Sequence, residues 1–335
     1  MTEALTLQRP DDWYRARLAP PTGRVRVVID TDTANEIDDQ FALAWALRCP
    51  QQLDVAAVYA EPFSFAHRRA SYPAGAHDAP PFNPPAQGME RSYQEIIKVY
   101  GLLGLPHAGR AYRGAAAYMA KPRTPVHSEA VDHLIATARE HTPDGPPLYV
   151  LALGCVTNIA SALLLAPDIA GRIVVVWTSG YPSHAPHVNH SFNLEQDLWA
   201  SQWLLDSGVP HVYLPGYHVG AQLRLSLAEV ERYVQGSGPI GGYLHQLFTH
   251  NPLWTIMGTD PTQAGEPHSW VIWDLICIAW ALNPAWVPSE LVRTPVLTDD
   301  KRWLAQPGRH WMREGHAVER DAIFNCLFAS LRAPG

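Results

Sequence analysis

Ten residues near the start of the chain, DTDTANEIDD at positions 30–39, hold five carboxyl groups in one short loop. The acids are Asp30, Asp32, Glu36, Asp38 and Asp39. Like charges this close repel and raise one another's pKa unless a cation or hydrogen-bond donors offset the repulsion. Carboxylate oxygens suit Ca²⁺ or Mg²⁺, and no matching group of His or Cys residues suggests zinc or copper. The spacing therefore predicts a site for a hard cation.

Two alternatives explain the same loop without a cation. An acidic turn can begin the next helix, where the helix dipole favours Asp38 or Asp39. An Asp-x-Asp pair after an apolar strand also resembles the opening of phosphatases of the haloacid dehalogenase type. Those enzymes need a downstream lysine and a further acidic pair. The chain has only Lys98, Lys121 and Lys301, and no GDxxxD motif follows.

The segments around this loop alternate between strand and helix patterns. Strands are expected at 25–30, 53–60, 148–153, 173–177 and 211–214, and helices at 41–47, 89–103, 129–140, 158–165 and 196–205. Parallel strands need crossover connections, so this order predicts an α/β fold: an open, mostly parallel, Rossmann-like sheet with helices on both faces. Ligands bind beyond the carboxyl ends of such strands, where the acidic loop lies.

The remaining segments have a different character. Residues 226–335 are expected to be mainly helical, with a glycine-rich break at 235–242 and an apolar helix at 273–282, and to complete the site of the 25–225 core. Residues 71–85 are so rich in proline that a loop or partial lid is expected. No shift in composition marks a linker, so residues 1–335 are expected to form a single domain.

Composition and charge exclude several classes of protein. Hydrophobic residues make up 47% and charged residues 17% of the 335, which argues against a disordered chain. The net charge of −7 argues against a nucleic-acid partner, because such partners need clustered Lys and Arg. No apolar run approaches the roughly 20 residues of a membrane span, and the first residues do not resemble a signal peptide. We therefore expect a cytoplasmic protein with no membrane partner.

Four segments together resemble the inosine/uridine nucleoside hydrolase family. The first, VVIDTDTANEIDDQFALAWAL, is similar to the family's DTDPGxDDAxAL, although its loop is two residues longer. The others are ALGCVTNIASAL, similar to ALGPLTNxA; SFNLEQDLWAS, similar to EFNxxxDPxAA; and VIWDLICIAWAL, similar to a late HDPxA or WD segment. They occur in the family's order and span residues 25–282.

The resemblance implies a hydrolase that cleaves the N-glycosidic bond of ribonucleosides to ribose and free base with a Ca²⁺-bound water. By that match, Asp32, Asp39 and Asp274 bind Ca²⁺ through their carboxylates, and Thr157 through its main-chain carbonyl. Asp32 is also the general base. Asp30 supports the loop and is not a ligand.

The same match implies the residues that bind substrate. They are Asp38, Asn189, Asn193, Trp273 and Asp274. An indole at position 273 can stack on a purine and make it easier to protonate, which favours purine substrates.

Two departures from the family pattern concern specificity. Ser191 stands where the family commonly has Glu, at the 5′ side of the sugar, and Glu61 lies near the position of a family Asn. A hydrolase of a different riboside, or a non-catalytic protein of the same fold that binds calcium and sugar, are therefore alternatives. The resemblance suggests a role in nucleoside salvage and a homodimer or homotetramer, although the sequence has no interface signature.

Overall fold

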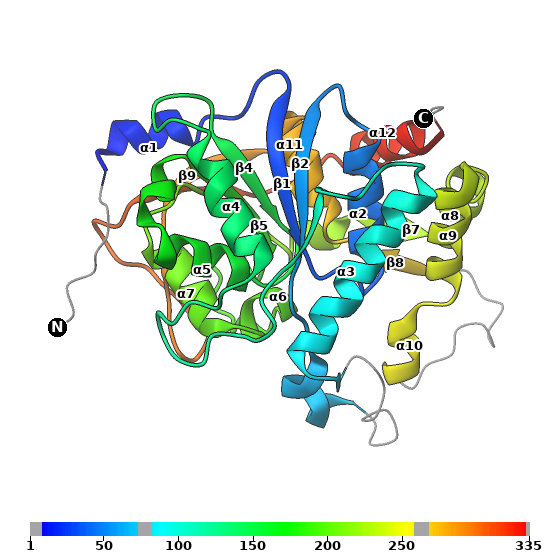
Figure 1. Ribbon diagram of the computed structural model, residues 1–335, viewed down its shortest axis with the longest axis horizontal. Coiled ribbons are helices and arrows are strands. Elements are labelled where there is room, and N and C mark those ends of the chain that lie inside the picture. The colour runs from blue at the N-terminus through cyan, green and yellow to red at the C-terminus, as the bar shows by residue number, and fades with distance from the viewer. Residues whose placement is uncertain (1–8, 73–81, 258–267, 333–335) are drawn as a thin grey trace.

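An eight-stranded sheet runs through the middle of the molecule (Figure 1). The computed structural model describes residues 9–72, 82–257 and 268–332. The strand order is β3-β2-β1-β4-β5-β6-β12-β9, and all neighbours pair in parallel except β12 and β9, which are antiparallel. The strands are β1 (Val25–Thr31), β2 (Leu53–Ala60), β3 (Ala111–Arg113), β4 (Leu148–Ala152), β5 (Ile173–Ser179), β6 (His211–Pro215), β9 (Ser289–Arg293) and β12 (Trp311–Gly315).

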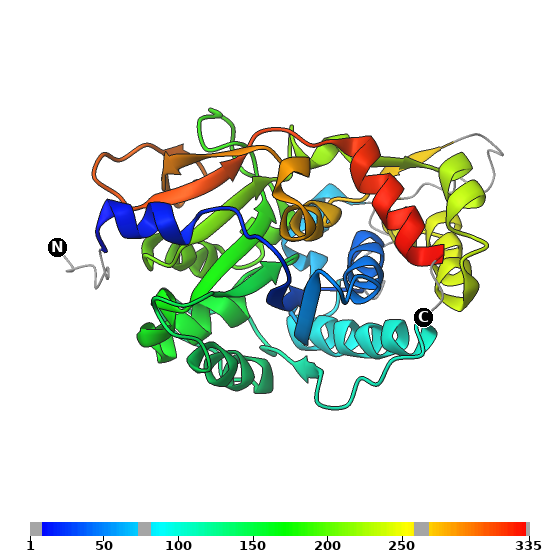
Figure 2. The ribbon, with the colours of Figure 1, turned by 90° about the horizontal axis from the view of Figure 1, so that it is seen from above.

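Helices cover both faces of this sheet (Figures 1 and 2). One face carries α4 (Glu129–Arg139), α5 (Thr157–Leu165) and α7 (Leu198–Asp206). The other carries α2 (Asp38–Leu47), α3 (Pro85–Leu102), α8 (Leu227–Tyr233), α9 (Gly238–Thr249), α11 (Leu275–Leu282) and α12 (Arg320–Arg332). The shorter helices are α1 (Asp11–Arg17), α6 (Phe192–Glu195) and α10 (Pro252–Met257). The α/β fold with a mostly parallel sheet is thus as predicted.

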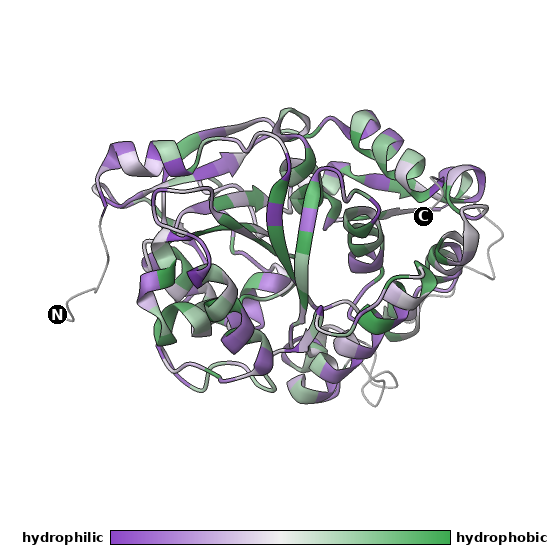
Figure 3. Cartoon of the chain, turned by 45° about the horizontal axis from the view of Figure 1, so that its top comes forward, coloured by the Kyte–Doolittle hydropathy of each residue, from purple (hydrophilic) through white to green (hydrophobic). Residues whose placement is uncertain are grey.

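The first strand shows why its sequence is apolar throughout. Val27 and Ile29 pack in the core on the α2 face, whereas Val28 packs in the core on the α5 face. Side chains of a strand alternate between faces, so a strand covered on both sides needs apolar residues in succession. Figure 3 shows the resulting pattern, with hydrophobic colour concentrated on the central strands.

The strand order reverses at β1. From β1 the chain proceeds through β2 to β3 in one direction, whereas β4, β5 and β6 continue from the other side of β1. The loops after β1 and β4 therefore leave the sheet in opposite directions and open a crevice between them, which is where open α/β sheets bind ligands.

The segment after α7 contains strands that the sequence analysis did not identify. β9 and β12 extend the main sheet, while β7 (Arg224–Ser226) pairs with β8 (Ser269–Val271), and β10 (Val296–Leu297) with β11 (Trp303–Leu304). These strands are short and partly exposed, so their apolar pattern is weak. The glycine-rich break expected at 235–242 is also shorter, because α9 begins at Gly238. The proline-rich loop falls largely on residues 73–81, outside the described residues.

None of the helices in the described part of the chain is long and apolar enough to cross a membrane.

Candidate functional site

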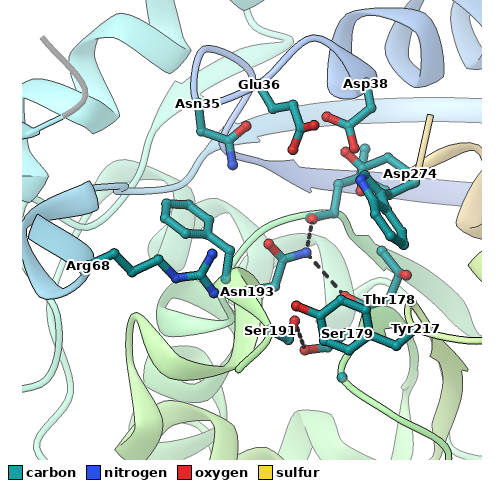
Figure 4. Close-up of a pocket in the computed structure, with 15 residues that line it drawn as sticks. Asn35, Glu36, Asp38, Arg68, Thr178, Ser179, Ser191, Asn193, Tyr217 and Asp274 are labelled. Atoms are coloured by element: carbon teal, nitrogen blue, oxygen red, sulfur yellow. Dashed lines mark hydrogen bonds between the residues drawn. The ribbon is translucent and has the colours of Figure 1, made fainter. Parts of the chain in front are cut away.

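A cavity of about 200 Å³ opens at the carboxyl end of the sheet, at the point where the strand order reverses. Residues from the loops after β1, β4, β5 and β6 line it, together with the start of α6 and the segment before α11 (Figure 4). Segments far apart in the chain therefore meet around one small volume.

Carboxyl groups gather on one wall of this cavity. Oxygen atoms of Asp38, Asp39 and Asp274 lie within 4.8 Å of one another, and each residue is at most 4% exposed. Burial raises the pKa of all three, that of Asp39 to about 6, and the neighbouring negative charges raise those of Asp38 and Asp274 further. Burial, followed by the charge of Asp39, likewise raises the pKa of Asp32. These carboxyl groups would repel one another if all were ionised, and no positively charged side chain among the described residues forms an ion pair with them.

Helix capping does not account for these carboxylates. Helix α2 begins at Asp38 behind Ile37, with no side-chain hydrogen bond at its N-terminus. Asp274 occupies the N-cap position of α11, yet its side chain makes no capping hydrogen bond either. The acidic-turn alternative is borne out for Asp38 and Asp39, which lie in the first turn of α2, where the helix dipole favours them. It does not account for Asp32, which precedes the helix.

The oxygen atoms left without donors indicate what the wall can hold. Asp32 Oδ1 and Asp39 Oδ2 are buried and have no hydrogen-bond partner. A buried anionic oxygen without a partner costs several kcal/mol, and a bound cation removes that cost. The donors are carboxylate oxygens, which are the ligands that hard divalent cations take. The residues present fit such an ion.

Three neighbours position Asp32. Asn35 Nδ2 donates to Asp32 Oδ2 over 2.8 Å, and Gln196 Nε2 approaches the same oxygen at 3.4 Å. A Cβ at Gly154 would lie 2.7 Å from Asp32 Oδ1, so the backbone after β4 can pack against this carboxylate only as glycine. Oδ2 is thus held in place while Oδ1 remains available.

Asn193 ties together the ends of two strands beside the cluster. Its Nδ2 donates to the carbonyl oxygen of Leu153 at 2.5 Å and to that of Thr178 at 3.1 Å. The side-chain oxygen is left as an acceptor in the cavity (Figure 4). Leu153 follows β4 and lines the cavity as well.

An aromatic pair completes the wall next to Asp274. The rings of Trp273 and Tyr217 meet edge to face, with centroids 6.0 Å apart and planes at 89°, and both residues line the cavity. This arrangement leaves apolar surface for a flat ligand beside the carboxylates.

Residues 27–319 match the sequence profile described as inosine-uridine preferring nucleoside hydrolase. The chain belongs to this nucleoside hydrolase family. It is 28% identical over 327 residues to the uncharacterised protein C1683.06c of Schizosaccharomyces pombe, covering 92% of this chain and 99% of that one.

Solved structures share the nucleoside hydrolase fold. A purine-preferring ribonucleoside hydrolase from Gardnerella vaginalis has a TM-score of 0.66 at 19% identity, with 92% of this chain and 98% of the other covered. The type III effector protein XopQ, complexed with adenosine diphosphate ribose, has a TM-score of 0.63 at 15% identity, with 96% and 97% covered. At these identities the likeness shows the fold alone.

The fold brings most of the predicted site residues together. Asp38, Asn193, Trp273 and Asp274 line the cavity, and Asp39 shares the carboxylate cluster with Asp38 and Asp274. These residues come from α2, from α6 and from the start of α11. Asp32 is buried outside the cavity lining, close enough to Asp39 for their charges to interact.

Two predicted site residues lie elsewhere. Asn189 is buried outside the cavity lining, where its Oδ1 accepts from the Tyr181 amide at 2.7 Å and its Nδ2 donates to the Lys301 carbonyl at 3.0 Å. Thr157 begins α5, and its hydroxyl donates to Asp197 Oδ2 at 2.7 Å. A carbonyl in the first turn of a helix points along the axis into the helix, so this geometry does not favour Thr157 as a ligand.

Asp30 and Glu61, neither of which was predicted to bind the metal, form hydrogen bonds with Asn158 near the start of α5. Asp30 Oδ1 accepts from Asn158 Nδ2 at 2.9 Å, and Glu61 Oε1 accepts from the Asn158 amide at 3.0 Å. Both acids are fully buried and outside the cavity lining. They hold the start of α5 against β1 and β2.

Sequence reasoning missed several residues that line or shape the cavity. Asn35 lies in the acidic loop and lines the cavity beside Glu36, which the sequence analysis had named only as one of the loop's acids. Arg68, from the 3₁₀ helix Phe65–Ser71, and Tyr217, from the loop after β6, stand in no motif. Gln196 lies within the SFNLEQDLWAS segment, but only its contact with Asp32 in the structure shows that it helps to position that carboxylate.

Proposed function

We propose that this protein hydrolyses the N-glycosidic bond of a ribonucleoside to give ribose and the free base. The observation that carries the proposal is the buried carboxylate cluster of Asp38, Asp39 and Asp274, of which Asp38 and Asp274 line the cavity. Asp39 Oδ2, and Oδ1 of the nearby Asp32, have no hydrogen-bond donor. Membership of the nucleoside hydrolase family supports the same reaction.

We propose Ca²⁺ as the cation, held by Asp32, Asp39 and Asp274. A main-chain carbonyl is expected to complete the protein's share of a six- to eight-oxygen shell. Leu153 is a better candidate for this carbonyl than Thr157, because Leu153 lines the cavity and its oxygen is turned to Asn193 there. A bound divalent ion would supply a Lewis acid that lowers the pKa of water and orients it.

The remaining roles follow from the positions of the side chains. Asp32 is the general base, because Asn35 holds one of its oxygens and the other is unpartnered. Asp38, Asp274 and the Asn193 oxygen accept hydrogen bonds from ribose hydroxyls. The carboxylates thereby orient the sugar so that C1′ faces the activated water, while the ring oxygen stabilises the cation-like transition state.

Purine bases are the favoured leaving groups in this proposal. Trp273 presents its ring to the cavity next to Asp274, at a position where it can stack on the base. The related proteins differ, one being a purine-preferring ribonucleoside hydrolase and another an effector protein complexed with adenosine diphosphate ribose. The substrate class therefore rests on this chain's own cavity.

The test is release of reducing sugar from a nucleoside panel in the presence of Ca²⁺. We expect ribose release that Asp32→Asn abolishes and that the control Asp54→Asn, at a partly exposed residue outside the cavity lining, leaves unchanged. Saturable ribose binding without any release would instead identify a binding protein of the same fold.

A further inference from the structure

Arg68 brings a fixed positive charge into a cavity whose carboxylate wall lies on the other side. Its guanidinium points into the cavity from the wall opposite Asp38 and Asp274 (Figure 4). Hydrolysis of an uncharged nucleoside needs no cation at this position. Arg68 therefore either binds a negatively charged ligand or has a purely structural role.

Pairing within the protein holds Arg68 in place. Its Nε donates to Glu195 Oε1 at 2.7 Å, and one Nη donates to the carbonyl oxygen of His190 at 2.5 Å. The guanidinium carbon also lies 5.2 Å from the centroid of the Phe192 ring. These contacts fix the direction of the side chain, which is 23% exposed and lines the cavity.

The single negative charge of Glu195 does not neutralise all the positive charge around it. Lys301 Nζ pairs with Glu195 Oε2 at 2.8 Å, so two permanent cations share one carboxylate that is only 7% exposed. His67 Nε2 and His190 Nδ1 lie 3.4 and 3.2 Å from the same carboxylate. Arg68, Lys301 and Glu195 together therefore carry a net charge of about +1 even with both histidines neutral, apart from Glu36, which also lines the cavity and whose pKa burial raises to about 7.

Hydroxyl groups line the same cavity as Arg68. Ser179 Oγ and Ser191 Oγ are 2.9 Å apart, so one donates to the other and the second proton can serve a ligand. Tyr217 lines the cavity too, and its hydroxyl donates to the His190 carbonyl at 3.0 Å. A guanidinium next to serine hydroxyls is the donor set that binds a phosphate monoester.

We infer that the cavity takes a riboside carrying a phosphate on its primary hydroxyl, with Arg68, Ser179 and Ser191 binding the phosphate. This inference rests on the proposed function for the position of the sugar. With the ring hydroxyls on the carboxylate wall, the primary hydroxyl is the ribose group that can extend to the opposite wall. Ser191 is small and uncharged, so it leaves space for the phosphate and does not repel it, whereas a carboxylate at this position would.

The reaction keeps the phosphate ester intact. The water oxygen bonds to C1′ as the C1′–N bond breaks, and Asp32 takes the proton of that water. The base leaves with the electron pair of the broken bond and receives a proton. The products are ribose 5-phosphate and the free base.

The experiment compares inosine 5′-monophosphate with inosine, and ribose 5-phosphate with ribose, on the full chain. We expect Arg68→Gln to lower the ratio of kcat/KM for the monophosphate to that for inosine by about 30-fold, the size of a lost charge-assisted contact. Ribose 5-phosphate binding, measured by calorimetry, should weaken by a similar factor. Arg69→Gln is the matched control, because Arg69 is exposed and lies 5.2 Å over the Phe82 ring, outside the cavity lining.

A second variant guards against loss of folding. Arg68→Lys keeps a charge beside Glu195 but loses the fork geometry, so it should fall between wild type and Arg68→Gln. Melting curves of both variants show whether each is folded.

The outcomes separate this inference from the proposed function. Cleavage of inosine with no advantage for the monophosphate, and equal effects of Arg68→Gln on both, would overturn the phosphate subsite alone. Arg68-dependent binding of ribose 5-phosphate without cleavage of either substrate would support the subsite and overturn the hydrolase. Absence of both binding and cleavage would overturn the two together.

Discussion

Buried carboxylates on two opposite sides of one cavity behave in opposite ways, one group at the cavity wall and the other, Glu195, paired with Arg68. On the first wall, burial raises the pKa values of Asp38, Asp39 and Asp274. On the second, burial also opposes ionisation of Glu195, but hydrogen bonds from His67 and Lys301 and the charge of Arg68 outweigh it and lower its pKa. The same chemical group is thus protonated readily in one place and strongly ionised in the other.

The two groups of carboxylates differ in pKa because only one of them has positively charged protein side chains next to it. The protein itself compensates Glu195, whereas the first cluster lies beside no cationic side chain among its described hydrogen-bond and ion-pair partners. A carboxylate group that a protein buries without its own cation is arranged for an external one. We therefore expect the first wall to bind a metal ion and the second to maintain structure and attract anions.

The largest expected effect is on the first wall. Asp39→Ala and Asp274→Ala should each lower turnover about a thousandfold, roughly 4 kcal/mol, because they remove an oxygen that holds the cation. Bound calcium, measured by elemental analysis, should fall in parallel. Asp54→Asn is the control, since Asp54 is partly exposed and pairs with Arg24 far from the cavity. Equal calcium content in all four proteins would contradict the ligand assignment.

Removing a carboxylate should have opposite effects on stability at the two walls. With divalent ions chelated, Asp39→Asn should raise the free energy of unfolding by about 1 kcal/mol, because it relieves repulsion. Glu195→Gln should lower it by about 3 kcal/mol, because it leaves Arg68 and Lys301 without their partner. Urea unfolding measures both. A loss of stability in both variants would remove the distinction between the walls.

A smaller effect concerns the base next to the first wall. Trp273→Ala should lower kcat/KM for inosine about tenfold more than for uridine, since stacking contributes roughly 1–3 kcal/mol per base and is stronger for purines. Trp273→Phe retains a flat ring and should restore much of the difference. The same loss on both nucleosides would show that Trp273 serves packing and not base selection.

The smallest effect is a pair of opposite pH slopes. Burial raises the pKa of Glu36 to about 7 and that of Asp39 to about 6, so the chelated folded protein binds protons that the unfolded chain has released. Its stability should therefore decrease as pH rises from about 4 through 7, and saturating Ca²⁺ should remove the part of the slope that comes from Asp39. Glu195, with its lowered pKa, stabilises the fold above its unfolded value of about 4.5 and loses that contribution as pH falls. Glu195→Gln should flatten only this acid side, which unfolding curves between pH 3 and 8 can measure.

Much of the fold followed from local patterns. The expected second strand has the observed bounds, β2 (Leu53–Ala60), and the expected helix at 129–140 differs from α4 by one residue. Segments covered on both faces are apolar throughout, so their sequences alone mark them. The edge strand β9 and its neighbour β12 escaped this reasoning, because partial exposure weakens the pattern.

The candidate site was predictable where a motif carried it. The acidic loop pointed to Asp32, Asp38 and Asp39, and the family resemblance added Asn193 and Asp274. Arg68 stands in no motif, and its importance appears only from its distance to Glu195 and its place in the cavity.

By itself, the sequence determined the alternation of strands and helices, the acidic loop after the first strand and the family. These properties depend on residues close together in the chain or on ordered motifs. The tertiary structure alone decided which carboxylates have protein partners, that Leu153 and not Thr157 lines the cavity, and that Arg68 faces the carboxylate wall. Ionisation and ligand binding depend on distances between residues far apart in sequence, and only the folded chain sets those distances.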